Sequence, residues 1–128
     1  MNTVIIAVGS NIDPDRNIPR AKDALEKCGE IIKQSAWIKT PPIGITDQPD
    51  FINGAVLLLS ALTQPELRFR LKMIEDRLGR DRSQPKYGPR PIDLDIVVWN
   101  NAVIDKDVYE RGFLKTAVRE LIPDILPE

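Results

Sequence analysis

Apolar and polar residues follow one another in a pattern that predicts four strands. Residues 3–8 form a short β-branched run, and residues 30–38 form a second extended stretch. In residues 51–59, odd- and even-numbered side chains face opposite sides, and Asn53 is a polar exception on an apolar stripe. Residues 92–99 form an apolar, β-branched run typical of a buried strand, although two aspartates lie inside it.

Apolar residues at helical spacing lie between these strands and predict helices there. Ile18, Ala21, Leu25 and Cys28 define one buried stripe, which follows the helix-start signal in residues 13–15. Cys28 is therefore expected in the core rather than as a reactive thiol.

A second helix is predicted to begin at residues 63–66, which form a capping box with proline in the first turn. Leu67, Leu71, Ile74 and Leu78 follow on one face. A short strand at residues 103–104 and a last helix over residues 109–121 complete the chain.

The order strand, helix, strand, strand, helix, strand is that of split β-α-β domains. We therefore expect residues 1–128 to form a single α+β domain, with a ferredoxin-like antiparallel sheet and helices packed on it.

Composition narrows the functional classes. The 18 Lys and Arg residues balance 19 Asp and Glu residues, so the totals indicate neither a nucleic-acid nor a membrane surface. A single cysteine fits a reducing compartment, and because we find neither a signal-peptide pattern nor a membrane-spanning run, we expect a cytoplasmic protein. The sequence has no histidine, which removes the commonest general base and argues against a zinc site.

The two aspartates of the fourth strand are the main candidates for metal binding. Asp93 and Asp95 are spaced i, i+2, so they point to the same face with Cα atoms about 7 Å apart. Such carboxylates repel each other unless a cation neutralises them, and Mg²⁺ with substrate phosphates suits oxygen ligands. The alternative is that both aspartates are solvated on an open strand face.

The segment before this strand favours the metal hypothesis. Residues 80–90 form a loop rich in arginine and lysine, and such side chains bind phosphate oxygens. Residues 40–50, with three prolines and a glycine, form a second long loop that is either an ordinary connection or a binding loop. Asn53, which follows it, needs either backbone partners or a ligand if it is buried.

Several blocks occur together in one order. They are Val-Gly-Ser-Asn at residues 8–11, Thr-Pro-Pro-Ile-Gly at 40–44, Asp-Gln-Pro-Asp-Phe-Ile-Asn at 47–53, Ile-Glu at 74–75, Leu-Gly-Arg at 78–80, Gly-Pro-Arg-Pro-Ile-Asp-Leu-Asp-Ile at 88–96 and Arg-Gly-Phe at 111–113. Together they resemble the 6-hydroxymethyl-7,8-dihydropterin pyrophosphokinase family of folate biosynthesis. The resemblance implies transfer of diphosphate from ATP to the hydroxymethyl group of the reduced pterin, releasing AMP.

The resemblance also implies roles for individual residues. Asp93 and Asp95 would hold two Mg²⁺ ions, and Arg80 and Arg90 would act catalytically on the transferring phosphates. The pterin ring would lie between two phenylalanines, within a set made up of Thr40, Pro41, Pro42, Ile43, Phe51, Asn53 and Phe113. ATP would be bound by Lys72, Glu75, Arg82, Tyr87, Ile96 and Arg111.

The sequence departs from the family pattern before Arg111. The family has a longer segment there, with a Pro-His pair that helps to hold ATP, whereas residues 105–110 are short and lack both residues. Tyr109 is a candidate for replacing part of that contact, and Lys72 stands where glutamine is common. Two other hypotheses therefore stay open: a pterin-binding protein with weak or no transferase activity, and a nucleotide-binding regulator. We expect a monomer, with a dimer as the alternative.

Overall fold

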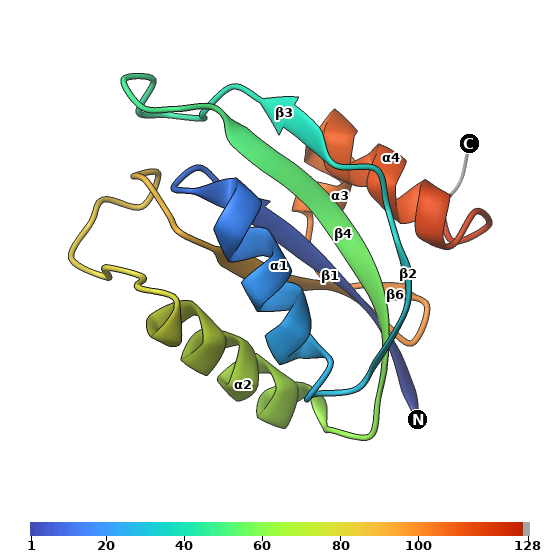
Figure 1. Cartoon of the computed structure of the whole chain (residues 1–128). Helices are drawn as coiled ribbons and strands as arrows, with labels where there is room; N and C mark the ends of the chain where they lie inside the picture. The colour runs from blue at the N-terminus through green and yellow to red at the C-terminus, as the bar shows by residue number, and fades with distance from the viewer. Residues whose placement is uncertain (127–128) are drawn as a thin grey trace.

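A computed structural model describes residues 1–126 of the chain, as a sheet with helices on both faces (Figure 1). The strands are β1 (Asn2–Ser10), β2 (Glu30–Gln34), β3 (Ile38–Thr40), β4 (Phe51–Ser60), β5 (Asp93–Trp99) and β6 (Ala102–Val103). The helices are α1 (Pro14–Leu25), α2 (Gln64–Arg77), α3 (Asp107–Glu110) and α4 (Gly112–Leu121).

The strand order confirms the predicted fold class. The sheet runs β2-β4-β1-β5-β6, β3 also pairs with β4, and every pair is antiparallel. Because β4 lies between β1 and β2, the unit made by β1, α1 and β2 is split, as the order of elements predicted.

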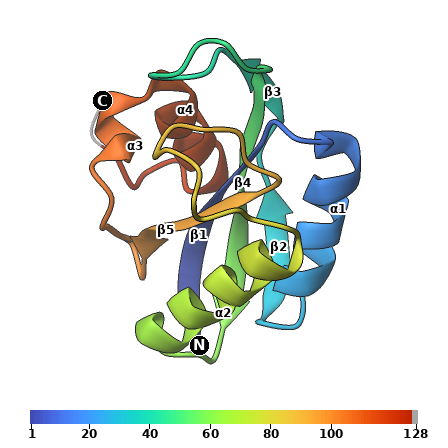
Figure 2. The same ribbon diagram turned by 90° about the vertical axis from the view of Figure 1, so that its left-hand side faces the viewer.

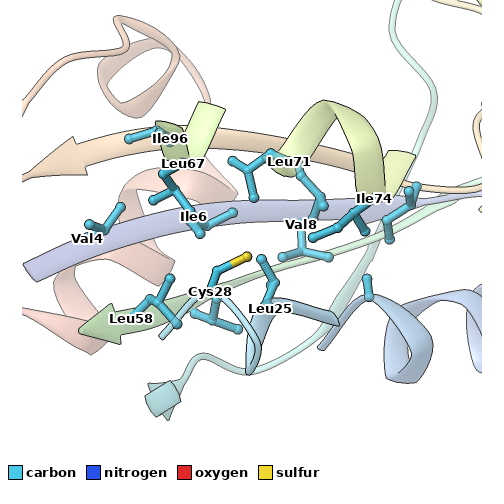
Figure 3. Close-up of a cluster of buried hydrophobic side chains, with 14 of the residues drawn as sticks. Val4, Ile6, Val8, Leu25, Cys28, Leu58, Leu67, Leu71, Ile74 and Ile96 are labelled. Atoms are coloured by element: carbon cyan, nitrogen blue, oxygen red, sulfur yellow. The ribbon is translucent and has the colours of Figure 1, made fainter. Parts of the chain in front are cut away.

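The first core fills the space between the sheet and helices α1 and α2 (Figure 3). Cys28 lies in this core with 7% of its surface exposed, and burial raises the pKa of its thiol, which confirms its expected role in packing. Side chains from three strands and two helices meet there, among them Val4, Ile6, Val8, Leu25, Leu58, Leu67, Leu71, Ile74 and Ile96.

A second core lies on the opposite face of the sheet, under α4. It is built by residues of β1, β4 and β5 that do not belong to the first core, with side chains of α3 and α4 packed on them. The division of β4 into two faces is therefore confirmed, since Ala55 lies in the second core and Val56 in the first. The members of the second core are Ile5, Ala55, Val97, Val98, Val108, Leu114, Ala117, Val118, Leu121 and Leu126.

The strand predicted over residues 30–38 is interrupted, which corrects the sequence prediction. β2 ends at Gln34, and Ser35 then uses its hydroxyl to accept the Ala55 N–H at 2.9 Å. The Ala36 N–H donates to the carboxylate of Glu120 on α4 at 3.0 Å, instead of to a strand. Side-chain acceptors thus replace the regular ladder at this bend, and pairing resumes at β3.

The predicted last helix is also divided. Residues 107–110 form α3, Arg111 is extended with φ −115° and ψ 113°, and α4 then begins at Gly112. The break allows Val108 and Leu114 both to reach the second core. The second helix agrees with its prediction: Thr63 and Glu66 form the capping box at the start of α2.

Three connections meet at one end of the sheet. They follow β1, precede β4 and precede β5, and Figure 2 looks at this end of the molecule. Within residues 1–126, none of the helices has the length and apolar character needed to cross a membrane.

Candidate active site

The strand register places the two aspartates of β5 on the α4 face of the sheet. Asp93 lies opposite Gly9 of β1 and Asp95 opposite Ala7, while Leu94 between them belongs to the first core. The expectation that both carboxylates share one face is therefore confirmed. Because Gly9 has no side chain and Ala7 has only a methyl group, the surface of the sheet is recessed beside the aspartates.

A cavity of about 310 Å³ occupies this recess. Phe51 enters from the start of β4 and Phe113 from the start of α4, so aromatic rings from two elements line it together with Asn53. A volume near 300 Å³ suits a small heterocyclic ligand. Of the residues expected to bind a pterin, the lining includes Thr40, Pro41, Ile43, Phe51, Asn53 and Phe113. Pro42 is not part of it.

Asn53 is held in place in the lining of this cavity. Its side-chain amide donates to the Thr40 hydroxyl at 2.6 Å, which joins β4 to the adjacent strand β3. A Cβ atom added at Gly9 would lie 2.7 Å from Asn53 Oδ1, so only glycine leaves room for the amide in this orientation. The Asn53 amide thus has a defined orientation in the cavity that Phe51 and Phe113 also line.

A second, more open cavity of about 450 Å³ lies between α2 and β5. Its lining includes Arg80 and four of the residues expected to bind ATP, namely Lys72, Glu75, Arg82 and Ile96. The other two, Tyr87 and Arg111, line the first cavity. Tyr109, the candidate for replacing a lost ATP contact, is 55% exposed and is not in the lining of either cavity. Four residues line both cavities: Arg90, Asp93, Asp95 and Asp105.

Two arginines converge on one carboxylate at this junction. Arg80 Nη1 lies 3.4 Å and Arg90 Nη1 3.3 Å from Asp93 Oδ1. Arg90 also donates to the backbone carbonyl of Lys86, which ties its guanidinium to the basic loop. The side chains of Arg80 and Arg90 are only 14% and 18% exposed, so both are partly desolvated before any ligand binds.

The second aspartate lies in a strongly negative environment. The pKa of Asp95 is raised to about 7, first because the protein around its carboxyl group removes part of its hydration. Repulsion from Asp93, Glu75 and Asp105 raises this pKa further, whereas Arg90 lowers it. Asp95 nevertheless stays open to the cavity, so its carboxylate is available to a ligand.

The donor set fits Mg²⁺ bound together with a phosphorylated substrate. Among residues 1–126, no cluster of three or more His, Cys, Asp or Glu side chains is arranged as a metal cage. Asp93 and Asp95 face an open cavity, and the surroundings of Asp95 disfavour its ionisation while no cation is bound. Such a pair suits Mg²⁺, which commonly binds one or two carboxylates and completes its coordination shell with phosphates and water.

A hydrogen-bonded network joins the three loops around the cavities. Asn11 Oδ1 accepts the Arg90 N–H at 2.8 Å, and Asn11 Nδ2 donates to Gln48 Oε1 at 2.8 Å and to the Pro49 carbonyl at 3.0 Å. Gln48 Nε2 donates to the Ile45 and Tyr87 carbonyls at 2.7 and 2.6 Å. The loop after β1, the loop before β4 and the loop before β5 are therefore positioned relative to one another.

Reasoning from the residues alone gave Asn11, Gln48 and Asp105 no role. Asn11 and Gln48 lie within blocks that carried the family resemblance, but their chemistry depends on contacts between loops that are distant along the chain. Asp105 directly follows the predicted short strand, and only its position beside Asp95 shows that it faces the site.

The fold and site thus define an α+β domain with two cavities, one lined by aromatic rings and the other open and polar. Two aspartates and two arginines lie where these cavities meet. Residues 5–123 match the sequence model of the 7,8-dihydro-6-hydroxymethylpterin-pyrophosphokinase family. Because this match spans most of the chain, the protein belongs to that family.

Similar proteins agree with this assignment. The chain is 33% identical over 137 residues to the 2-amino-4-hydroxy-6-hydroxymethyldihydropteridine pyrophosphokinase of Pseudomonas aeruginosa, covering 98% of this chain and 84% of the relative. It is 33% identical to the protein of the same name from Bacillus subtilis, over 99% and 82% of the two chains. It is also 37% identical to the mitochondrial folate synthesis bifunctional protein of Arabidopsis thaliana, covering 93% of this chain. The chain spans about a quarter of the length of the plant bifunctional relatives that it matches.

Proposed function

We propose that this protein transfers a diphosphate group from ATP to 6-hydroxymethyl-7,8-dihydropterin and releases AMP. In this reaction the hydroxymethyl oxygen attacks the β-phosphorus of ATP, the bond from that phosphorus to the α-phosphate oxygen breaks, and the hydroxyl proton passes to solvent. The observation that carries the proposal is the junction of the two cavities, where Asp93, Asp95, Arg80 and Arg90 lie between a pocket for a flat ring and an open polar site.

The first cavity is the proposed pterin site. Phe51 and Phe113 present aromatic rings from two different elements, and flat heterocycles bind well between such rings. Asn53 offers hydrogen-bonding groups whose orientation is set by Thr40. A pterin bound there would direct its hydroxymethyl group toward the aspartates, which line the same cavity. We keep Pro42 in the proposed pterin set on the family resemblance alone.

The second cavity is the proposed ATP site. Lys72, Arg80 and Arg82 supply positive charge along α2 and the loop that follows it, and Ile96 supplies an apolar surface. Arg90 lines both cavities and can therefore reach a phosphate that passes from one ligand to the other. Tyr87 and Arg111, which line the first cavity, would contact ATP only at the junction.

Asp93 and Asp95 are the proposed ligands of two Mg²⁺ ions. When bound, Mg²⁺ would neutralise phosphate charge and make the β-phosphorus a better acceptor. Arg80 and Arg90 would stabilise the charge that accumulates on the phosphate oxygens during transfer. Phosphoryl transfer depends on positioning and charge neutralisation more than on a covalent nucleophile, and these four side chains supply both.

The remaining parts of the proposal concern the whole molecule. We propose that residues 1–128 act as one domain, that the protein is cytoplasmic and monomeric, and that it does not act on nucleic acid or membranes. The support is the single cysteine, the balanced charge and the one continuous sheet. Light scattering during size-exclusion chromatography would detect a dimer, which is the alternative state.

Product analysis tests the proposed reaction directly. Protein, ATP, Mg²⁺ and the reduced pterin are incubated, and nucleotides and pterins are separated by chromatography. We expect equal amounts of AMP and pterin diphosphate, and neither product when the pterin or Mg²⁺ is omitted. The Asp95→Asn variant should lose activity, whereas Asp23→Asn, which changes an exposed carboxylate on α1, should keep it. AMP release that does not require the pterin, or no AMP at all, would overturn the proposal.

A further inference from the structure

One buried carboxylate next to the site is already fully engaged by protein groups. Glu75, on the last turns of α2, is 5% exposed. Its Oε2 atom accepts the Leu94 N–H at 2.9 Å and lies 3.2 Å from Arg80 Nη1, and its Oε1 atom lies 3.3 Å from Arg82 Nη2. Both oxygens therefore have partners before any nucleotide arrives.

These contacts connect Glu75 to the reacting centre through two routes. The Leu94 N–H belongs to the residue between the two aspartates, so the bond fixes the outer edge of β5 beside both carboxylates. The Arg80 atom that contacts Glu75, Nη1, is the same atom that lies 3.4 Å from Asp93. Glu75 and Asp93 thus both hold Arg80 through the same guanidinium nitrogen.

Burying the Glu75 carboxylate has an energetic cost, which its partners offset. Burial raises the pKa of Glu75, and Asp93 raises it further, whereas Leu94, Arg80 and Arg82 oppose the shift. A carboxylate in such a place is retained only when its partners compensate for lost hydration. An apolar residue at this position would pack against the first core without that cost, but it would remove the Glu75 contact of Arg80 and leave the contact with Asp93.

We propose that Glu75 is a positioning residue, which aligns Arg80 with the transferred phosphate, and that it is not a ligand of the nucleotide. This inference rests on the proposed function and deepens it, because it changes the role of a residue in the proposed ATP set. Arg80 would otherwise sample many rotamers, since an arginine side chain is long and flexible. Held between Glu75 and Asp93, its guanidinium is directed into the junction before ATP binds.

The proposal predicts which kinetic constant changes. A residue that acts through Arg80 affects the transition state, so Glu75→Gln should lower kcat by about 10- to 100-fold and change the KM for ATP by less than about threefold. Glutamine keeps the length of the side chain and an oxygen for the Leu94 N–H, but it lacks the charge that attracts Arg80. A nucleotide ligand would instead show a raised KM with kcat retained.

A double-mutant cycle with Arg80 provides the decisive comparison. If Glu75 acts through Arg80, the Glu75→Gln, Arg80→Ala double variant should be about as slow as Arg80→Ala alone, within about threefold. Losses that multiply would overturn the proposal. Asp76→Asn is the matched control, because Asp76 lies beside Glu75 on α2 and binds Arg82 at 2.9 Å without contacting Arg80. It should leave kcat near the wild-type value, and an equal loss in this variant would assign the effect to Arg82.

Two further measurements separate this proposal from its alternatives. Melting curves are recorded for every variant, and a purely structural role is shown if Glu75→Gln lowers Tm while kcat at a temperature below both transitions is unchanged. If Glu75→Gln does not fold, Glu75→Asp keeps the charge but shortens the reach to Arg80, and it should show the same kcat loss.

The last measurement does not depend on turnover, so it remains decisive even if the wild-type protein releases no AMP and the proposed function fails. The Arg80 guanidinium N–H signals in ¹⁵N spectra should exchange with water at least about tenfold faster in the variant. Unchanged exchange would overturn the positioning role.

Discussion

Asn11→Ala removes the centre of the network that joins the three loops. The wild-type side chain makes three hydrogen bonds, to Arg90, Gln48 and Pro49, and it is only 4% exposed. Alanine fills less space and offers neither a donor nor an acceptor. The Arg90 N–H, which Asn11 Oδ1 accepts at 2.8 Å, then loses its acceptor at the mouth of the site.

The size of the effect follows from how well water can replace each bond. A buried group left without a partner costs about 1–3 kcal/mol. Pro49 is exposed, so water compensates in part for the loss of its bond, and most of the cost comes from the Arg90 N–H and the Gln48 side chain. We expect a decrease of about 2–3 kcal/mol in the free energy of unfolding. For a chain of this length that corresponds to a Tm about 6–12 °C lower.

Urea unfolding and a thermal melt, without ligands, measure this loss. Gln48→Ala serves as the comparison and should cost about 1 kcal/mol, because Gln48 is more exposed and its remaining partners can be hydrated. In a cycle of the two changes the costs should not add, because both remove the bond between Asn11 and Gln48. If Asn11→Ala melts within about 2 °C of the wild-type protein, the network does not stabilise the loops.

Four further predictions concern the site itself. Because the pKa of Asp95 is raised from 3.8 to about 7 on folding, the metal-free protein should lose stability as pH rises from about 4 to 7. Asp95→Asn should therefore raise the Tm of the metal-free protein at pH 8. An unchanged or lower Tm would contradict the assignment. The affinity for a non-hydrolysable ATP analogue, measured by calorimetry, should depend on Mg²⁺. It should also increase as the pH rises from about 4 to 7, because Asp95 ionises. Equal affinity with and without Mg²⁺ would count against the metal site. Arg90→Ala should lower kcat by roughly a hundredfold or more at saturating substrates while pterin affinity stays the same, whereas near-normal turnover with a lower Tm would mean that Arg90 only pairs with Asp93. Asn53→Ala should weaken pterin binding by about 1–3 kcal/mol in a titration, and an unchanged dissociation constant would exclude the assigned pocket.

The secondary structure was largely predictable because its signals are local. The capping box at Thr63 and Glu66 and the apolar stripe that includes Leu71 are short patterns whose physical cause lies within one helix. Alternation in β4 likewise predicted which side chains share a face. The prediction failed at residues 35–37, where contacts with a distant segment outweigh local preference. It also failed at Arg111, where the break between two helices lets Val108 and Leu114 both reach the second core.

The same distinction applies to the site. The spacing of Asp93 and Asp95 was enough to predict that they share a face, and the composition of residues 80–90 was enough to predict a cationic neighbour. Residue type and spacing along one strand contain that information, because a β-strand alternates its side chains whatever its neighbours are.

Only the tertiary structure decided which groups those aspartates face. The pairing of β5 with β1 placed small residues in front of them and opened the cavity, and the packing of α2 beside β5 brought Glu75 to the Leu94 N–H. The pKa of Asp95 depends on Asp105, ten residues further along, and on Glu75, twenty residues before it. Such effects arise from distances across the fold, and no pattern within a few residues of sequence encodes them.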